Sequence, residues 1–236
     1  MGICTISNPP QNLLSEPEFI DIDFLKETVS DQSLKALIIN GEGRHFSAGA
    51  DRHLLFGMSS SKNFKAQIEK GKALLDYIEM LDIPVIAMIK GACFGGGLEI
   101  ALACHIRICS ENSIFALPET GLGLIPGLGG TQRLSRLISK PRAVKMILEA
   151  SMINSLQAKE FRLVDFVVNG KETETFTFDL IRQMTENRTS KVIRYAMRSI
   201  NNSGSLPVDK AMKKETKLFC ILAKEEAKRQ MLEGKQ

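Results

Sequence analysis

The sequence predicts an α/β fold with parallel strand pairing, and three observations support this prediction. Short apolar runs alternate with helical patterns through the first half of the chain. Several of these runs are apolar throughout, as is typical of strands buried in a parallel sheet. Three glycine-rich segments stand where the runs give way to helical patterns. Strand–helix–strand repetition of this kind is characteristic of α/β proteins.

Local patterns place the elements of this first half. Strands are expected at 3–7, 34–40, 83–91 and 106–110, and helices at 22–30, at 64–81 and directly after the glycine cluster 95–97. We expect a loop over 54–63. Thr131 follows the third glycine-rich segment, GLGLIPGLGG, and its hydroxyl fits the N-cap of an amphipathic helix.

The character of the chain changes after residue 168, where strands give way to helical patterns at 173–186, 190–201 and 207–234. The segments NRTS and NNSGSLP separate these helices. We therefore predict a core region over 1–170 and a helical region over 171–236. The last helix carries apolar residues in a charged setting, which suit either a subunit contact or packing on the core: Met212, Leu218, Phe219, Leu222 and Met231.

Composition narrows the class of protein. With 236 residues, 44% of them hydrophobic, the chain can fill a sizeable core without metal or disulfide bonds. The net charge of +4 comes without an aromatic-interleaved basic stripe, so no nucleic-acid partner is expected. No run reaches the roughly 18 apolar residues of a membrane span, and MGICTISNPP has neither a basic leader nor an apolar signal core. We expect a cytoplasmic protein.

The five cysteines lie mostly in apolar runs and show no CxxC pairing or His-rich partner segment. They are expected to be reduced core residues rather than metal ligands: Cys4, Cys93, Cys104, Cys109 and Cys220. No metal site is predicted.

Two glycine-rich segments have the features of an anion-binding helix entrance. FSAGAD (46–51) and FGGGLE (94–99) each follow a predicted buried strand. Backbone N–H groups and the helix dipole favour negative charge at such a position, as an enolate formed from a thioester requires. Taken singly, each segment also fits an ordinary turn of small residues.

Two glutamates adjoin these segments. Glu99 opens the apolar helix LEIALAC, where its charge is costly unless it lines a site or caps the helix end. Glu119, in FALPETGLG, precedes the third glycine-rich segment, and taken in isolation it fits an ordinary loop charge better than a site residue. Two carboxyls around one water molecule could take a proton from that water and give a proton to a neighbouring carbon.

In this order and spacing the segments resemble the crotonase superfamily, in particular its enoyl-CoA hydratase/isomerase branch. The resemblance runs from residue 3 to residue 168. It rests on NPPQNLL, GRHFSAGAD, IKGACFGGGLEIALACHIRI, SIFALPETGLGLIPGLGGTQRL and FRLVDFVV. It implies a spiral of ββα turns and a helical C-terminal region that mediates trimers, often paired into hexamers, and closes the pocket.

The resemblance also implies roles for single residues. The amides of Ala50 and Gly96 would form an oxyanion hole, Glu99 would activate water as general base, and Glu119 would exchange a proton with the α-carbon. The amide of Gly127 would lie near the reacting water. With both glutamates present, the implied reaction is reversible syn hydration of a trans-2-enoyl thioester to a 3-hydroxyacyl thioester.

The implied substrate is an acyl-coenzyme A, so no separate cofactor is expected. Positions implied to border it are Ala48, Gly49, Asp51, Arg52, His53 and Gly95. Arg52 and Arg44 suit phosphate, or are solvated surface charges. The histidines His45, His53 and His105 are expected to be non-catalytic.

Three departures from the family pattern keep alternatives open. An edge strand that relatives have before residue 3 is missing, His105 stands where relatives commonly have aspartate, and the match after residue 168 is weak. The alternatives are double-bond isomerisation, dehydration of an acyl group on a carrier protein in a biosynthetic pathway, and a non-catalytic acyl-CoA-binding oligomer.

Overall fold

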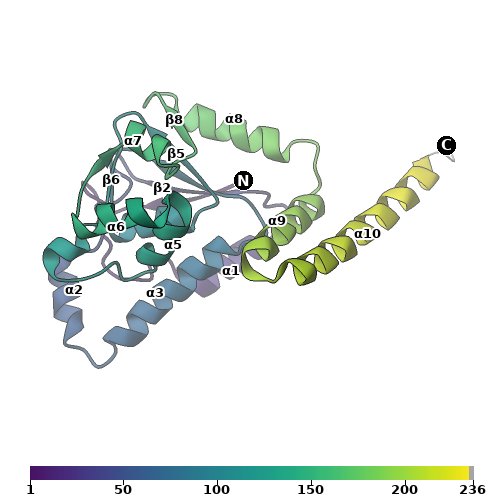
Figure 1. The fold of residues 1–236 in the computed structure, drawn as a ribbon. Helices are drawn as coiled ribbons and strands as arrows, with labels where there is room; N and C mark the ends of the chain where they lie inside the picture. The colour runs from purple at the N-terminus through teal and green to yellow at the C-terminus, as the bar shows by residue number, and fades with distance from the viewer. Residues whose placement is uncertain (234–236) are drawn as a thin grey trace.

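The computed structural model describes residues 1–233, in which a parallel sheet is covered by helices and followed by a helical extension (Figure 1). Five strands pair in parallel in the order β1-β2-β3-β5-β8. They are β1 (Gly2–Ile6), β2 (Leu37–Gly41), β3 (Val85–Ile89), β5 (Ile106–Ser110) and β8 (Phe166–Val168). The predicted α/β fold with parallel pairing is confirmed.

A second sheet of three short strands lies beside the first, in the order β4-β6-β7. Its strands are β4 (Ala92–Phe94), β6 (Ile114–Ala116) and β7 (Ile153–Asn154). The predicted strand 83–91 is shorter in the structure, where β3 covers Val85–Ile89, and Gly91, at φ +55°, turns the chain into β4, which was not predicted. One pair in this sheet, β6 with β7, is antiparallel.

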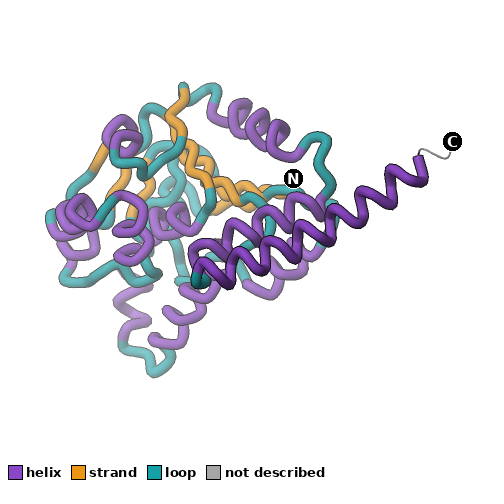
Figure 2. Tube along the Cα trace, turned by 45° about the vertical axis from the view of Figure 1, so that its right-hand side comes forward, coloured by secondary structure: helices purple, strands orange, loops and turns teal. Residues whose placement is uncertain are grey.

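The helices surround both sheets (Figure 2). They are α1 (Ile22–Ser30), α2 (Arg52–Ser59), α3 (Phe64–Glu79), α4 (Gly96–Ala103), α5 (Gly130–Ile138), α6 (Lys140–Leu148), α7 (Ser155–Glu160), α8 (Thr173–Thr185), α9 (Ser190–Ser205) and α10 (Val208–Glu233), with the 3-10 helix η1 (Pro118–Leu122). Figure 1 shows α9 and α10 side by side, with the end of α10 projecting beyond the body.

Several local predictions were wrong. The loop expected over 54–63 is helical as far as Ser59, because the Asp51 carboxylate accepts hydrogen bonds from the His53 and Leu54 amides and caps α2. Thr131 is not an N-cap: α5 begins at Gly130, after Gly129 in a left-handed conformation. The third glycine-rich segment begins within η1 and does not directly follow a strand.

At the C-terminal end, α9 runs through the expected break NNSGSLP as far as Ser205. The helix ends where Leu206 is extended before Pro207, since a residue that precedes proline disfavours the helical conformation. Gly234, the expected last residue of the final helix, lies outside the described residues. Within residues 1–233, no helix has both the length and the apolar character needed to cross a bilayer.

Each face of the main sheet carries its own core. On one face Ile38, Ile86 and Ile108 pack with Ile181 of α8. The larger core on the other face holds residues of α3, α4 and α5. Every residue of α4 is buried, Glu99 included. Because α8 packs on the sheet, it is continuous with the core in space, and the division at residue 170 stays a prediction.

Candidate active site

A cavity of about 410 Å³ opens where the two glycine-rich segments meet. Its lining includes every residue predicted for the site except His53: Glu99, Glu119, Ala50, Gly96, Ala48, Gly49, Asp51, Arg52, Gly95 and Gly127. Apolar residues of α2 and α3 complete the wall, among them Leu55, Phe64 and Ile68. Segments distant in sequence thus converge on one space of a size suited to a small-molecule ligand.

The N–H of Ala50 is left free to face this space, because the hydrogen bonds on either side of it, at Gly49 and Asp51, are made with Leu14. Leu14 forms a parallel bridge with Ala50, in which the Leu14 amide donates to the Gly49 carbonyl and the Asp51 amide donates to the Leu14 carbonyl, both at 2.9 Å. In a parallel bridge the central residue points its N–H to the opposite side. Within residues 1–233 the Ala50 N–H has no acceptor.

Gly96 offers a second N–H at the start of α4, where the first amides of a helix have no intrahelical partner. It too has no acceptor within the described part of the chain. A Cβ on Gly96 would lie 4.0 Å from the Ala50 nitrogen, and one on Gly49 would lie 2.8 Å from the Phe94 carbonyl oxygen. Glycine therefore permits the close approach of the two segments.

Asn12, which the sequence did not single out, supports the first segment. Its side chain is fully buried and donates to the carbonyls of Glu42 at 2.9 Å and His45 at 2.8 Å. The Ser47 hydroxyl donates to the Asn12 carbonyl and accepts from the Gly49 amide. A buried amide that bonds two backbone oxygens fixes the path of the loop that carries Ala50.

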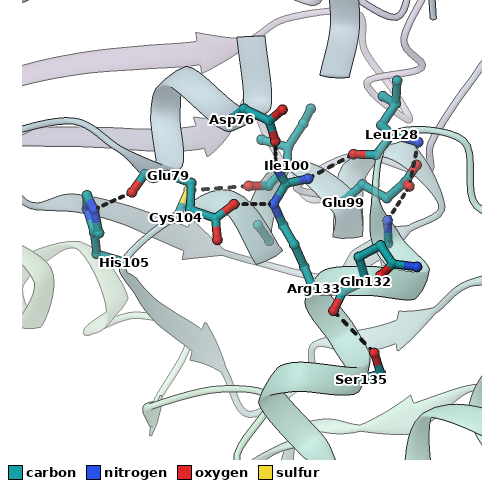
Figure 3. A network of polar contacts seen from close by, with 12 residues as sticks. Asp76, Glu79, Glu99, Ile100, Cys104, His105, Leu128, Gln132, Arg133 and Ser135 are labelled. Carbon is teal, nitrogen blue, oxygen red and sulfur yellow. Dashed lines mark hydrogen bonds and ion pairs between the residues drawn. The ribbon is translucent and has the colours of Figure 1, made fainter. Parts of the chain in front are cut away.

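Glu99 is 2% exposed, and its Oε1 accepts hydrogen bonds from the amides of Leu128 and Gly130, both at 2.7 Å (Figure 3). Burial raises the pKa of the Glu99 carboxyl, while these two hydrogen bonds and the charges of Arg133 and Lys72 oppose the rise. The two amides belong to the turn that leads into α5 and to its first residue, and nothing in the local sequence around Glu99 indicates them.

Glu119 lies in η1, and its side chain lines the same cavity as Glu99. Burial, and then the charge of Glu99, raise the pKa of Glu119 to about 7. Its Oε2 is buried without a hydrogen-bond partner among residues 1–233. A Cβ on Gly95 would lie 3.0 Å from Glu119 Oε1, so this carboxyl reaches the glycine cluster. The two glutamates differ in environment: Glu99 accepts from two amides of another segment, whereas one carboxyl oxygen of Glu119 has no partner among residues 1–233.

Replacement of Gly130 by alanine is expected to destabilise the fold by about 1–3 kcal/mol. The added Cβ would lie 2.9 Å from Pro126 Cβ and 3.0 Å from both Cγ and Oε1 of Glu99, so the glutamate must move. Urea unfolding of Gly130→Ala measures this loss. Gly127→Ala is the matched control in the same turn, because its Cβ would meet no atom within 4 Å. Equal stability of the two variants would contradict the packing described.

The comparisons with known proteins agree with this geometry. A model of the enoyl-CoA hydratase/isomerase family matches residues 2–236. The chain belongs to this family. The predicted resemblance is therefore confirmed, and the crotonase fold that it implied is also found in solved enoyl-CoA hydratases.

Two curated relatives and one solved structure illustrate the similarity of this hydratase/isomerase family member to known proteins. A probable enoyl-CoA hydratase of Bacillus subtilis is 40% identical over 165 residues, which cover 70% of this chain and 64% of the relative. The fatty acid oxidation complex subunit alpha of Idiomarina loihiensis is 45% identical over 142 residues, 59% of this chain and 20% of the subunit. The chain thus spans less than two thirds of either relative's length. An enoyl-CoA hydratase from Bacillus anthracis superposes with a TM-score of 0.81 at 30% identity, covering 92% and 84% of the chains.

Two of the three histidines of this family member form hydrogen bonds to its backbone through their rings. His105 Nδ1 accepts from the Val85 amide at 2.9 Å, and its Nε2 lies 3.1 Å from the Glu79 carbonyl oxygen. Burial lowers the pKa of His105, so the ring is a neutral link between β3 and α3. His45 Nδ1 accepts from the Ala92 amide. His53 and Arg44 do not line the glutamate cavity.

Proposed function

We propose that this chain catalyses the reversible syn hydration of a trans-2-enoyl-coenzyme A to a 3-hydroxyacyl-coenzyme A. The observation that carries the proposal is one cavity bordered by two unpaired amides and two glutamates in unlike environments. Family membership supports the same reaction.

In the proposed mechanism the thioester carbonyl oxygen accepts hydrogen bonds from the amides of Ala50 and Gly96. Electrons leave the carbon–carbon double bond for this oxygen when water adds, and two preorganised donors lower the energy of the resulting enolate. The donors are backbone groups fixed by the Leu14 bridge and by α4, so little reorganisation accompanies the charge.

The glutamates move the protons. In the proposed step the Glu99 carboxylate, whose Oε1 accepts from two amides, takes a proton from water as the water oxygen bonds to the β-carbon. Glu119, with its pKa near 7, then gives its proton to the α-carbon as the enolate collapses. Dehydration runs the same steps backward, from protonated Glu99 and ionised Glu119. The pair therefore holds one proton in either direction.

Purified protein offered trans-2-enoyl-coenzyme A thioesters of short, medium and long chain should consume the conjugated double bond and yield 3-hydroxyacyl products. Turnover restricted to carrier-bound thioesters would favour the carrier-protein dehydratase instead. Conversion of 3-enoyl to 2-enoyl thioesters without hydration would favour an isomerase. Tight binding of acyl-coenzyme A with no conversion would favour a non-catalytic binding protein.

The value of kcat/KM is expected to fall as pH rises through about 7, with the same limb in hydration and dehydration. Below about pH 7 Glu119 retains the proton that the pair requires, and above it that proton is lost. The limb is shared because hydration neither takes up nor releases protons overall, so the ratio of the two kcat/KM values equals a pH-independent equilibrium constant. Rates that stay constant from pH 6 to 9 would contradict the assignment.

The remaining expectations belong to the same proposal. Arg52, on the cavity wall, would contact a coenzyme A phosphate. Assembly into a trimer or a paired hexamer is supported by Leu148, Met152 and Leu156, which are 71%, 64% and 72% exposed. Sedimentation of a monomer would contradict it. A cytoplasmic location is supported by five unpaired cysteines, as is typical of a reducing compartment.

A further inference from the structure

A second cavity, of about 560 Å³, is lined by residues of α3, the end of α4, α5 and α9, and neither Glu99 nor Glu119 lines it. Arg133 lines it and is only 7% exposed, whereas Arg136, one turn further along the same helix, also lines it and is exposed. The contrast singles out Arg133, because a buried guanidinium must find acceptors for its donors.

Those acceptors come from two directions (Figure 3). On the side of α3, Nε donates to Glu79 Oε2 at 2.7 Å and Nη2 to Asp76. On the side of the first cavity, Nη1 donates to the Leu128 carbonyl at 2.9 Å. The guanidinium passes directly over Gly129, where a Cβ would lie 2.5 Å from Nη1. Arg133 therefore fastens the turn 128–130 to α3.

The same turn supplies both hydrogen bonds to Glu99. The amide of Leu128 donates to Glu99 Oε1, while the carbonyl of Leu128 accepts from Arg133. These two groups of Leu128 belong to neighbouring peptide planes that meet at its Cα, so the bond to Arg133 fixes one plane and limits the N–H of the other to rotation about the backbone dihedrals of Leu128. Arg133 forms no hydrogen bond with Glu99 itself. It bonds Leu128, whose amide donates to Glu99, and in this way restrains a donor on which the glutamate depends.

We infer that Arg133 is a positioning residue that orients Glu99 through the turn 128–130, with Asp76 and Glu79 as its anchors. The inference rests on the role proposed for Glu99 in hydration. It assigns no contact with substrate to Arg133, which acts through backbone amides.

The charges around Glu99 support this inference. Arg133 and Lys72 are the cations that oppose the rise in its pKa, and Glu119 is the acid across the cavity. The other buried arginine, Arg107, bonds the Leu163 carbonyl and Asp165 and has no link to this turn. Of these two arginines, only Arg133 combines a charge effect on Glu99 with a hydrogen bond to Leu128, whose amide donates to Glu99.

The first test compares Arg133→Met with Arg136→Met in the wild-type chain. Arg133→Met should lower kcat for hydration on the order of tenfold to hundredfold with little change in KM, since a misaligned base slows the chemical step. Arg136→Met should match wild type. In a Glu99→Gln background Arg133→Met should cause no further loss, because both changes remove the same function. A loss that is additive to that of Glu99→Gln would overturn the inference.

The second test needs no turnover. With ¹³C-labelled glutamate carboxyls, the Glu99 signal is identified by its disappearance in Glu99→Gln, and its pKa should be higher in Arg133→Met than in wild type. An unchanged pKa would overturn the positioning role even if activity fell. If Arg133→Met does not fold, Arg133→Lys keeps the charge without the fork and should give smaller changes of the same sign. If wild type does not hydrate any enoyl thioester but Arg133→Met still raises the pKa of Glu99, the proposed function is wrong and the positioning role of Arg133 is supported.

Discussion

Glu119→Gln is expected to lower hydration turnover by about 10²–10⁴-fold, because a neutral amide cannot deliver a proton to the α-carbon. The same variant should lose exchange of the α-protons of a saturated acyl-coenzyme A with deuterated solvent. That exchange needs only the enolate, the two amides and one base, so it isolates Glu119 from the chemistry of water. Mass spectrometry of the recovered thioester measures it.

Stability provides the control for Glu119→Gln. The pKa of Glu119 in the fold, about 7, lies above its ordinary value of 4.5, so wild type loses stability as pH rises from 4.5 to 7 and the variant does not. Thermal melting should therefore match at low pH and favour Glu119→Gln above pH 7. A variant that melts below wild type at pH 8 would show that the loss of activity reflects damage to the fold.

Glu99→Gln is expected to reduce hydration by a similar factor, about 10²–10⁴-fold, but to keep α-proton exchange within about tenfold of wild type. Its amide oxygen can still accept from Leu128 and Gly130, so the turn is preserved, yet the side chain can no longer take a proton from water. Hydration assays and the exchange experiment on the same preparation separate the two steps.

Glu111→Gln is the matched control for both glutamates, since Glu111 is exposed and lies outside the cavity. It should hydrate and exchange like wild type. Loss of exchange in Glu99→Gln, or its survival in Glu119→Gln, would reverse or remove the assigned roles.

The sequence predicted those features of the candidate cavity for which the signal is local. Glycine at 49 marks a close backbone approach, and glycine at 95 and 96 leaves room for the side chains of Glu119 and Leu14. A glutamate in an otherwise apolar helix is costly to bury as a charge, which suggests that it has a function, and Glu99 is indeed buried at the cavity. The buried parallel strands were also predicted from a local signal, their apolar runs, although their predicted ends differ from the observed ends by a few residues.

What the sequence could not provide was pairing between distant segments. The Leu128 amide lies 29 residues from Glu99 along the chain, and Asn12 supports carbonyls at 42 and 45. Such partners are set by the fold, not by spacing. Asp51 shows a related ambiguity: the same carboxylate fits a ligand contact and a helix cap, and the helix that it caps was predicted as a loop.

The bridge between Leu14 and Ala50 also bears on how such a protein can diverge. The donors proposed to bind the substrate oxygen belong to the main chain, so replacing the Ala50 side chain would leave its N–H in place. The acids, by contrast, are ordinary side chains and can be swapped singly. A descendant could therefore acquire a new reaction by changing its acids while inheriting intact the means of stabilising the intermediate.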